Sequence, residues 1–296
     1  MHTNEGLTHI SGEKRALLAD LTGQLSRIPG MAAVVLGGSY ASQTQHAGSD
    51  LDIGLYYREA QPFSIADIRR TAESISADRT PTVTNFYEWG AWVNGGAWIH
   101  TAQGKVDFLY RSLEHVQRTI DEAQQGITHH DYNQQPPYGF YSVIYLAETQ
   151  ICIPLYDPDG QIAGLKHQVT AYPPKLKQRI VADTLWNAEF TLLNAQGFAA
   201  QGDVYNTVGC LTRAAGKMTQ ALFALNERYF IRDKQVMKTM AAFSVLPEGY
   251  IAQVNQILAR PGSTPDELAR AVSDLGQAWR GVAALAGDLY QPKFNL

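Results

Sequence analysis

Residues 31–57 decide the fold, and they read MAAVVLGGSYASQTQHAGSDLDIGLYY. The apolar run Val34–Leu36 ends on two glycines, which predicts a buried strand that enters a tight turn. A short helix is expected to begin at Ser39, with the backbone N–H groups of its first turn directed at an anion. On the strand that follows, Asp50 and Asp52 are two residues apart, so both carboxylates leave the same face.

A cation is the expected partner of these two carboxylates, because neighbouring negative charges repel each other. Mg²⁺ is the expected ion, since it prefers oxygen ligands and keeps contacts to substrate phosphates. The alternative interpretation is a glycine-rich turn followed by solvated acids on an edge strand. The combination of Gly-Gly-Ser and Ser-Asp-x-Asp between two apolar strands favours the metal site.

This combination resembles the signature of the DNA polymerase beta-like nucleotidyltransferase superfamily, in which Gly-Ser is followed after about ten residues by Asp-x-Asp. Gly38, Ser39, Asp50 and Asp52 match that signature. The resemblance implies that the Gly-Ser turn holds a nucleoside triphosphate and that the two aspartates hold two Mg²⁺ ions. The chain departs from many small members at residues 42–43, where those members have a basic residue and a glycine.

A third acid, Asp107, lies inside the segment Lys105–Tyr110, whose alternation predicts a strand. Such an acid is costly unless it is paired or bound to metal, and a salt bridge to Lys105 or Arg111 is the alternative. The superfamily has a third acid on a later strand, so the resemblance implies that Asp107 completes the metal site and takes the proton of the attacking hydroxyl. Glu88 is the rival base, because the small-molecule branch, which includes aminoglycoside nucleotidyltransferases, often has a glutamate near the acceptor hydroxyl.

Three of the five tryptophans lie in the segment 89–98, around a Gly-Gly pair. The segment Val83–Trp89 has strand composition, and a hairpin is predicted at the glycines, with Trp89 and Trp98 filling the core. The alternative is an aromatic wall for a base or sugar ring beside the metal site.

Strand signals end near residue 160, so a nucleotidyltransferase domain at 1–160 and a helical bundle at 161–296 are predicted. The fold class is therefore α/β (α+β) with a mixed sheet, followed by an all-α domain. Thr264-Pro265-Asp266-Glu267 is a clear helix start, with a cap, an early proline and a glutamate three residues later. Similar bundles close the acceptor cleft in the aminoglycoside nucleotidyltransferase relatives.

A helix expected from Asp203 carries polar side chains at helical spacing on one face, among them Arg213 and Lys217. These two cations are predicted to bind triphosphate oxygens across the cleft, with Lys217 favoured over Arg213. A solvated outer face is the alternative. The full stripe is Asn206, Cys210, Arg213, Lys217 and Gln220.

Composition limits the remaining functional classes. The chain has 296 residues, 45% of them hydrophobic and 18% charged, with a net charge of −4 and a pI of about 6.1. No basic run stands out, which disfavours a nucleic-acid partner. Cys152 and Cys210 lack metal-ligand spacing, and no stretch is apolar enough to span a membrane, so a reduced, cytoplasmic protein is expected.

The sequence therefore predicts an Mg²⁺-dependent enzyme that moves a nucleoside monophosphate, AMP from ATP, onto a hydroxyl of a small molecule such as an aminoglycoside-like antibiotic. A nucleotide-binding regulator or antitoxin with little turnover, and a protein-modifying (AMPylating) transferase, are the alternatives. The acceptor, the nucleotide, the choice of base and the oligomeric state stay open.

Overall fold

The computed structural model describes residues 7–46 and 48–296, so the first six residues of the predicted 1–160 domain lie outside it. The chain divides into two compact units, Met1–Asp121 with Ser142–Ala171, and Glu122–Tyr141 with Tyr172–Leu296. This division differs from a single boundary after residue 160. Helix α6 (Gln161–Gln168) stays with the first unit, and the segment Glu122–Tyr141 joins the second.

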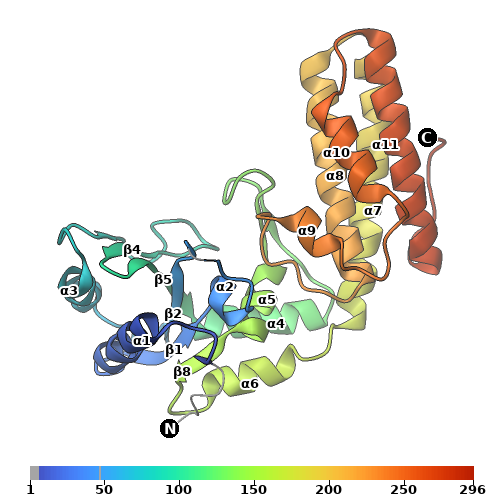
Figure 1. Ribbon diagram of the computed structural model, residues 1–296. Coiled ribbons are helices and arrows are strands. Elements are labelled where there is room, and N and C mark those ends of the chain that lie inside the picture. The colour runs from blue at the N-terminus through green and yellow to red at the C-terminus, as the bar shows by residue number, and fades with distance from the viewer. Residues whose placement is uncertain (1–6, 47) are drawn as a thin grey trace. The chain divides into compact units, whose positions relative to one another are not determined.

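A mixed six-stranded sheet is the frame of the first unit, with strand order β3-β4-β5-β2-β1-β8 (Figure 1). β2 and β5 run parallel, and the other neighbouring strands run antiparallel. Pro154 lies on the edge strand β8, where its missing N–H costs no internal ladder bond. The strands are β1 (Met31–Leu36), β2 (Leu51–Tyr57), β3 (Thr82–Val83), β4 (Gly96–Thr101), β5 (Gly104–Ser112) and β8 (Ile153–Tyr156).

The core of the first unit lies on one face of this sheet. Val106, Phe108 and Tyr110 of β5 are buried there, in one cluster with Leu21 and Ile68 from two helices. Because strand side chains alternate, residues 105, 107, 109 and 111 face the opposite side. The helices of this unit are α1 (Gly12–Leu25), α2 (Gly38–Ala41), α3 (Ile65–Ile75), α4 (Leu113–Gln124, whose last residues enter the second unit), α5 (Val143–Ile151) and α6.

Helix α5 covers one end of the opposite sheet face. There Glu148 of α5 pairs with the buried guanidinium of Arg111, at 2.9 Å between Nε and Oε2. The face is more open at Asp52 and Asp107, which are both only partly buried. The first unit therefore has a sheet surface that is covered at one end and accessible at the other.

The tryptophan-rich segment differs from its prediction. Within residues 82–95 only Thr82–Val83 pairs as a strand, and the hairpin turn falls at residues 102–103 instead of the Gly-Gly pair. Residues 84–94 form a loop because side chains bind its backbone. The Asn85 amide donates to Oε2 of Glu88 at 2.7 Å, and the Tyr87 amide donates to Oδ1 of Asn94 at 2.8 Å. The predictions of a strand over residues 83–89 and of a hairpin at the glycines are wrong.

The second unit is a helical bundle with a small β-ribbon (Figure 1). The predicted capping box is confirmed at the start of α11, where Thr264 accepts from the Glu267 amide. Trp279 of α11 is buried and donates from Nε1 to the Leu185 carbonyl at 3.1 Å, which fixes α11 against α7. The elements are β6 (His130–Asp131), β7 (Phe140–Tyr141), α7 (Pro174–Ala200), α8 (Val204–Leu225), α9 (Val236–Met240), α10 (Tyr250–Ala259), α11 (Pro265–Ala286) and a 3₁₀ turn (Gly287–Leu289).

A buried carboxylate anchors the C-terminal residues to α7. Glu189 is fully buried, and its oxygens accept from the Tyr290 hydroxyl and from the amides of Lys293 at 2.8 Å and Phe294 at 2.7 Å. These donors satisfy the charge without an ion pair. No helix in the described part of the chain is long and apolar enough to cross a membrane.

Candidate active site

The turn after β1 is built directly against the carboxylate of Asp52. The Gly37 amide donates to the Asp52 carbonyl at 2.8 Å, and Gly38 then takes a φ of 58° as α2 begins. A Cβ on Gly38 would lie 1.7 Å from Oδ2 of Asp52. Glycine is therefore required at residue 38, both by the backbone conformation and by the approach of the carboxylate.

Two of the predicted acids are brought together by strand register. Asp52 of β2 and Asp107 of β5 are direct partners on adjacent parallel strands, so their side chains leave the same face. Asp50 precedes β2 by one residue and contributes to the electrostatic environment of Asp107. The three acids predicted from separate parts of the sequence thus share one region of the sheet.

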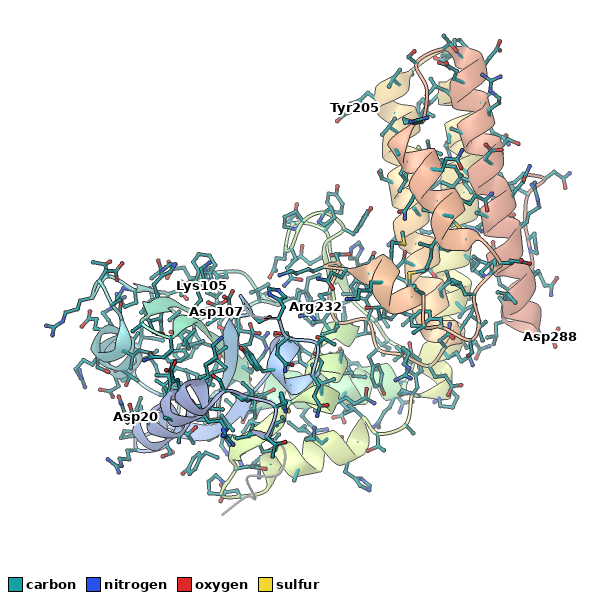
Figure 2. All side chains as sticks on the ribbon, viewed as in Figure 1. Asp20, Lys105, Asp107, Tyr205, Arg232 and Asp288 are labelled. Carbon is teal, nitrogen blue, oxygen red and sulfur yellow. The ribbon has the colours of Figure 1, made fainter. Side chains whose placement is uncertain are left out.

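The pKa of Asp107 is raised, first by burial and then by the negative charge of Asp50. Lys105 and His100 act in the opposite direction, and Figure 2 shows Lys105 and Asp107 near one another in the first unit. Neither Lys105 nor Arg111 forms an ion pair with Asp107, and Arg111 is instead paired with Glu148. The salt-bridge alternative for Asp107 is therefore not what the structure shows.

The chemistry of this donor set fits a divalent cation. Asp50, Asp52 and Asp107 offer only oxygen ligands, and a bound cation would offset the burial and the negative charge of Asp50 that raise the pKa of Asp107. Their side chains do not yet converge as a coordination shell: among residues 7–46 and 48–296, no three His, Cys, Asp or Glu side chains lie close enough to hold a metal ion. The acids form a candidate metal site by register and chemistry.

Glu88, the rival base, lies in the loop of residues 84–94. Its Oε2 accepts from the backbone amide of Asn85 at 2.7 Å and from the Asn85 side chain at 3.1 Å. The Glu88 carboxylate therefore stabilises the loop conformation.

The two predicted cations lie in the second unit, on α8. Lys217 Nζ is 5.3 Å from the centre of the Tyr141 ring, and Arg213 Nη2 donates to Asn187 Oδ1 at 3.1 Å. The pKa of Lys217 is lowered by burial and then by Arg213, and within the described chain neither cation has a carboxylate partner. Together with His130 and Tyr138, these residues line a cavity of ≈ 460 Å³ made only of second-unit residues.

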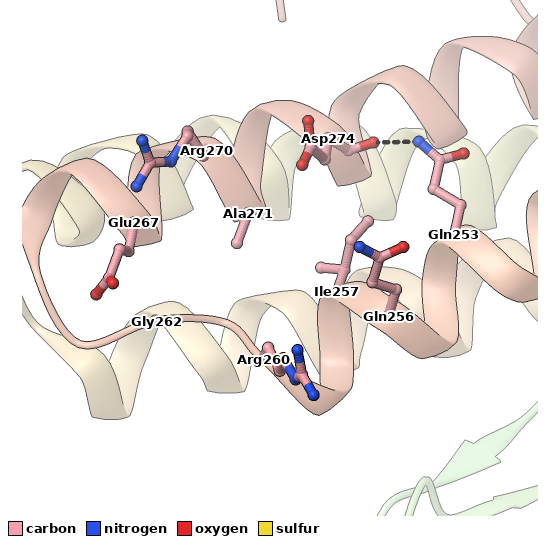
Figure 3. Close-up of a pocket in the computed structure, with 9 residues that line it drawn as sticks. All are labelled: Gln253, Gln256, Ile257, Arg260, Gly262, Glu267, Arg270, Ala271 and Asp274. Carbon is pink, nitrogen blue, oxygen red and sulfur yellow. Dashed lines mark hydrogen bonds between the residues drawn. The ribbon is translucent and has the colours of Figure 1, made fainter.

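A second cavity of ≈ 410 Å³ lies between α10 and α11 (Figure 3). Its lining includes Arg260, Arg270, Glu267 and Asp274. Glu267 is engaged by the capping box, and the Asp274 carbonyl accepts from Gln253 at 3.0 Å. Because charges of both signs line it, this cavity favours no single ligand class.

Two residues of the site region were placed wrongly from the sequence, because Trp89 and Trp98 were both predicted to fill the core. Trp98 is 52% exposed, since it shares the open sheet face with Asp107, and Trp89 is only partly buried and stacks on Trp98. The alternation along the strand could have revealed this exposure. Ala97 and Ile99 point to one face, and Trp98 and His100, which both carry an N–H group, point to the other.

Comparison with known proteins identifies the domain that carries these acids. Residues 19–124 match the family described as a nucleotidyltransferase domain, and residues 144–234 match a domain of unknown function, DUF4037. The first match spans the Gly-Ser turn and all three acids, so the chain contains a nucleotidyltransferase domain and is an enzyme of the nucleotidyltransferase class. The predicted fold class, a mixed-sheet nucleotidyltransferase domain followed by a helical region, is confirmed.

Among solved structures, the chain is similar to a nucleotidyltransferase-like protein from Exiguobacterium sibiricum 255-15. The TM-score is 0.46 at 10% sequence identity, over 94% of this chain and 78% of that one, which is too distant to bear on function. Comparison with curated proteins returned no match.

Proposed function

We propose that the protein is an Mg²⁺-dependent nucleotidyltransferase that moves AMP from ATP onto a hydroxyl of a small molecule, with an aminoglycoside-like antibiotic as one candidate acceptor. The observation that carries this proposal is the register pair of Asp52 and Asp107, with the Gly38 turn packed against Asp52. In the same sheet Arg111 forms an ion pair with Glu148 of α5, whereas Asp107 forms no such pair among the described residues, which leaves its carboxylate available to a metal ion.

Asp50, Asp52 and Asp107 would hold the metal ions, and bound Mg²⁺ supplies charge neutralisation on the phosphates and a lowered pKa for the acceptor hydroxyl. The backbone of Gly38 and the hydroxyl of Ser39 orient the phosphates, so that the α-phosphorus is open to in-line attack.

Asp107 takes the proton from the attacking hydroxyl. It is the register partner of Asp52 on the same sheet face, so its carboxylate lies where a hydroxyl held at the metal site would present its proton. Glu88 is the weaker candidate, since Asn85 already donates two hydrogen bonds to one of its oxygens.

Lys217 and Arg213 bind anionic oxygens such as those of a phosphate group. In support, the two cations lie near one another without a carboxylate partner among the described residues, and the pKa of Lys217 is lowered first by burial and then by repulsion from Arg213. An anion in the cavity would relieve that repulsion.

The decisive variant is Asp52→Asn, assayed with ATP labelled at the α-phosphate. Loss of one metal-binding carboxylate is expected to lower transfer by about 10³-fold or more, while circular dichroism and the melting temperature show an intact fold. Asp20→Asn, at an exposed acid of α1, is the matched control (Figure 2). Full activity in Asp52→Asn would exclude the metal-site mechanism.

The same label separates the alternatives when it is followed in a lysate. Label on a small molecule supports the proposal, and label on protein indicates a protein-modifying enzyme instead. ATP binding without any transferred label would indicate a nucleotide-binding regulator.

A further inference from the structure

The open face of the sheet continues beyond the acids onto β4, where it carries the exposed indole of Trp98. Trp98 is the direct register partner of Asp107, which is itself the partner of Asp52, so the three side chains form one row across three strands. Trp98 is 52% exposed, and the ring of Trp89 stacks on it with centroids 4.8 Å apart and planes 24° apart.

The loop and the strand are both shaped to hold this pair. The Trp89 amide donates to the Asn94 carbonyl at 2.8 Å, and Asn94 is itself buried and bonded to the Tyr57 hydroxyl at 2.9 Å. A Cβ on Gly96 would lie 3.0 Å from the Trp89 ring and 1.8 Å from the Phe108 carbonyl, so a glycine leaves room for the ring against the strand. The indole pair is therefore pre-organised before any ligand binds.

The order of the strands places Trp98 and Trp89 on the side of the acids that lies away from the Gly38 turn. Moving across the sheet, the Gly38 turn follows β1, Asp52 lies on β2, Asp107 on β5 and Trp98 on β4. In-line transfer places the attacking oxygen and the leaving phosphates on opposite sides of the phosphorus. If the leaving phosphates lie at the Gly38 turn, as the proposed function has it, the attacking hydroxyl arrives from the β4 side.

We propose that Trp98, backed by Trp89, is the platform on which the acceptor lies, and that the acceptor is a polyhydroxylated ring, a sugar or cyclitol. Such a ring lays its C–H face on the negative face of the indole and directs one hydroxyl toward Asp107. The next register pair on the same face, His100 and Lys105, supplies donors for the other hydroxyls of the ring. This inference rests on the proposed function for the direction of attack.

The test uses the full chain labelled with 5-fluorotryptophan, with the Trp98 resonance assigned from Trp98→Phe. The probes are Mg²⁺ with a non-hydrolysable ATP analogue (AMPCPP), and a panel of neutral and amino sugars and cyclitols such as maltose, myo-inositol and kanamycin A. At least one ring compound is expected to shift the Trp98 resonance. Trp98→Ala should then weaken binding of that compound about tenfold and leave AMPCPP affinity unchanged, while Trp98→Phe keeps most of it.

The control is Trp186→Ala, which removes another exposed tryptophan that is stacked on Phe190 in the second unit. The inference is overturned if no ring compound shifts the Trp98 resonance, or if Trp98→Ala weakens AMPCPP as much as the ring compound, since the indole would then hold the nucleobase. Failure of AMPCPP to bind with Mg²⁺ counts against the proposed function instead, because the Trp98 resonance is read without nucleotide.

Discussion

Two buried or half-buried carboxylates, Glu189 in the helical unit and Asp107 in the sheet unit, are treated in opposite ways by the fold. Glu189 accepts from a hydroxyl and two backbone amides that lie a hundred residues further along the chain. Asp107 has a second acid in its electrostatic environment and forms no ion pair with any residue that the structure describes. Under the proposed function, the difference separates a charge that holds the fold together from a charge that binds a ligand.

The cations show the same contrast. Arg111 is buried and paired with Glu148, whereas Lys217 lies over the Tyr141 ring and near a second cation, Arg213. Leaving a partly buried charge without a counter-charge costs stability, so such a charge is informative about function. Substitutions at four residues test this contrast.

Asp107→Asn should give the largest effect. Transfer of labelled AMP should fall by about 10³-fold or more, because the variant removes a carboxylate that we propose as both metal ligand and base. Stability in Mg²⁺-free buffer at pH 7 should rise, since a raised folded-state pKa means that ionisation of Asp107 destabilises the fold. Thermal unfolding with and without Mg²⁺ measures this, and a lower melting temperature of the metal-free variant would show that Asp107 has a structural role.

Glu189→Ala should lower stability and leave transfer unchanged. The free energy of unfolding should fall by about 3 kcal/mol, because three donors lose a charged acceptor in a buried site. Urea unfolding measures the loss, and the transfer rate per folded molecule should not change. Glu73→Gln, at an exposed acid of α3, is the control. A catalytic defect in folded Glu189→Ala would contradict its assignment as a purely structural charge.

Lys217→Ala should have a smaller effect, on binding alone. Affinity for ATP should fall about tenfold, measured by calorimetry, because a partly desolvated cation is lost. Stability should stay equal or rise, as the variant removes repulsion with Arg213. Lys238→Ala, at an exposed lysine of α9, should change neither quantity. Unchanged affinity in Lys217→Ala would favour the alternative interpretation, in which the polar face of α8 is only a solvated surface.

Asp233 should give the smallest effect, seen only in the pH dependence of stability. Burial raises the pKa of Asp233 to about 6, so the folded state holds a proton that the unfolded state releases near pH 4. Its contribution to stability is therefore present at low pH and lost as pH rises toward 6. Asp233→Asn should remove this pH dependence of stability and raise the melting temperature at pH 7. Melting temperatures of both proteins between pH 4 and 6 test this, and an unchanged pH dependence in the variant would refute the prediction.

Local patterns predicted much of the fold and part of the site. The Gly-Ser turn, the β2 acids and the capping box at Thr264 are written in neighbouring residues, whose spacing matches strand and helix periods directly. The loop at residues 84–94 was missed because apolar composition cannot reveal that the Glu88 and Asn94 side chains bind the backbone.

The sequence by itself determined which residues alternate, which turns need glycine and where helices begin, because these depend on steric and hydrogen-bonding preferences within a few residues. Only the tertiary structure decided that Asp52, Asp107 and Trp98 form one row and that Glu189 meets the C-terminal residues. Register between strands and docking of distant segments are set by the packing of the whole unit, which no local spacing encodes.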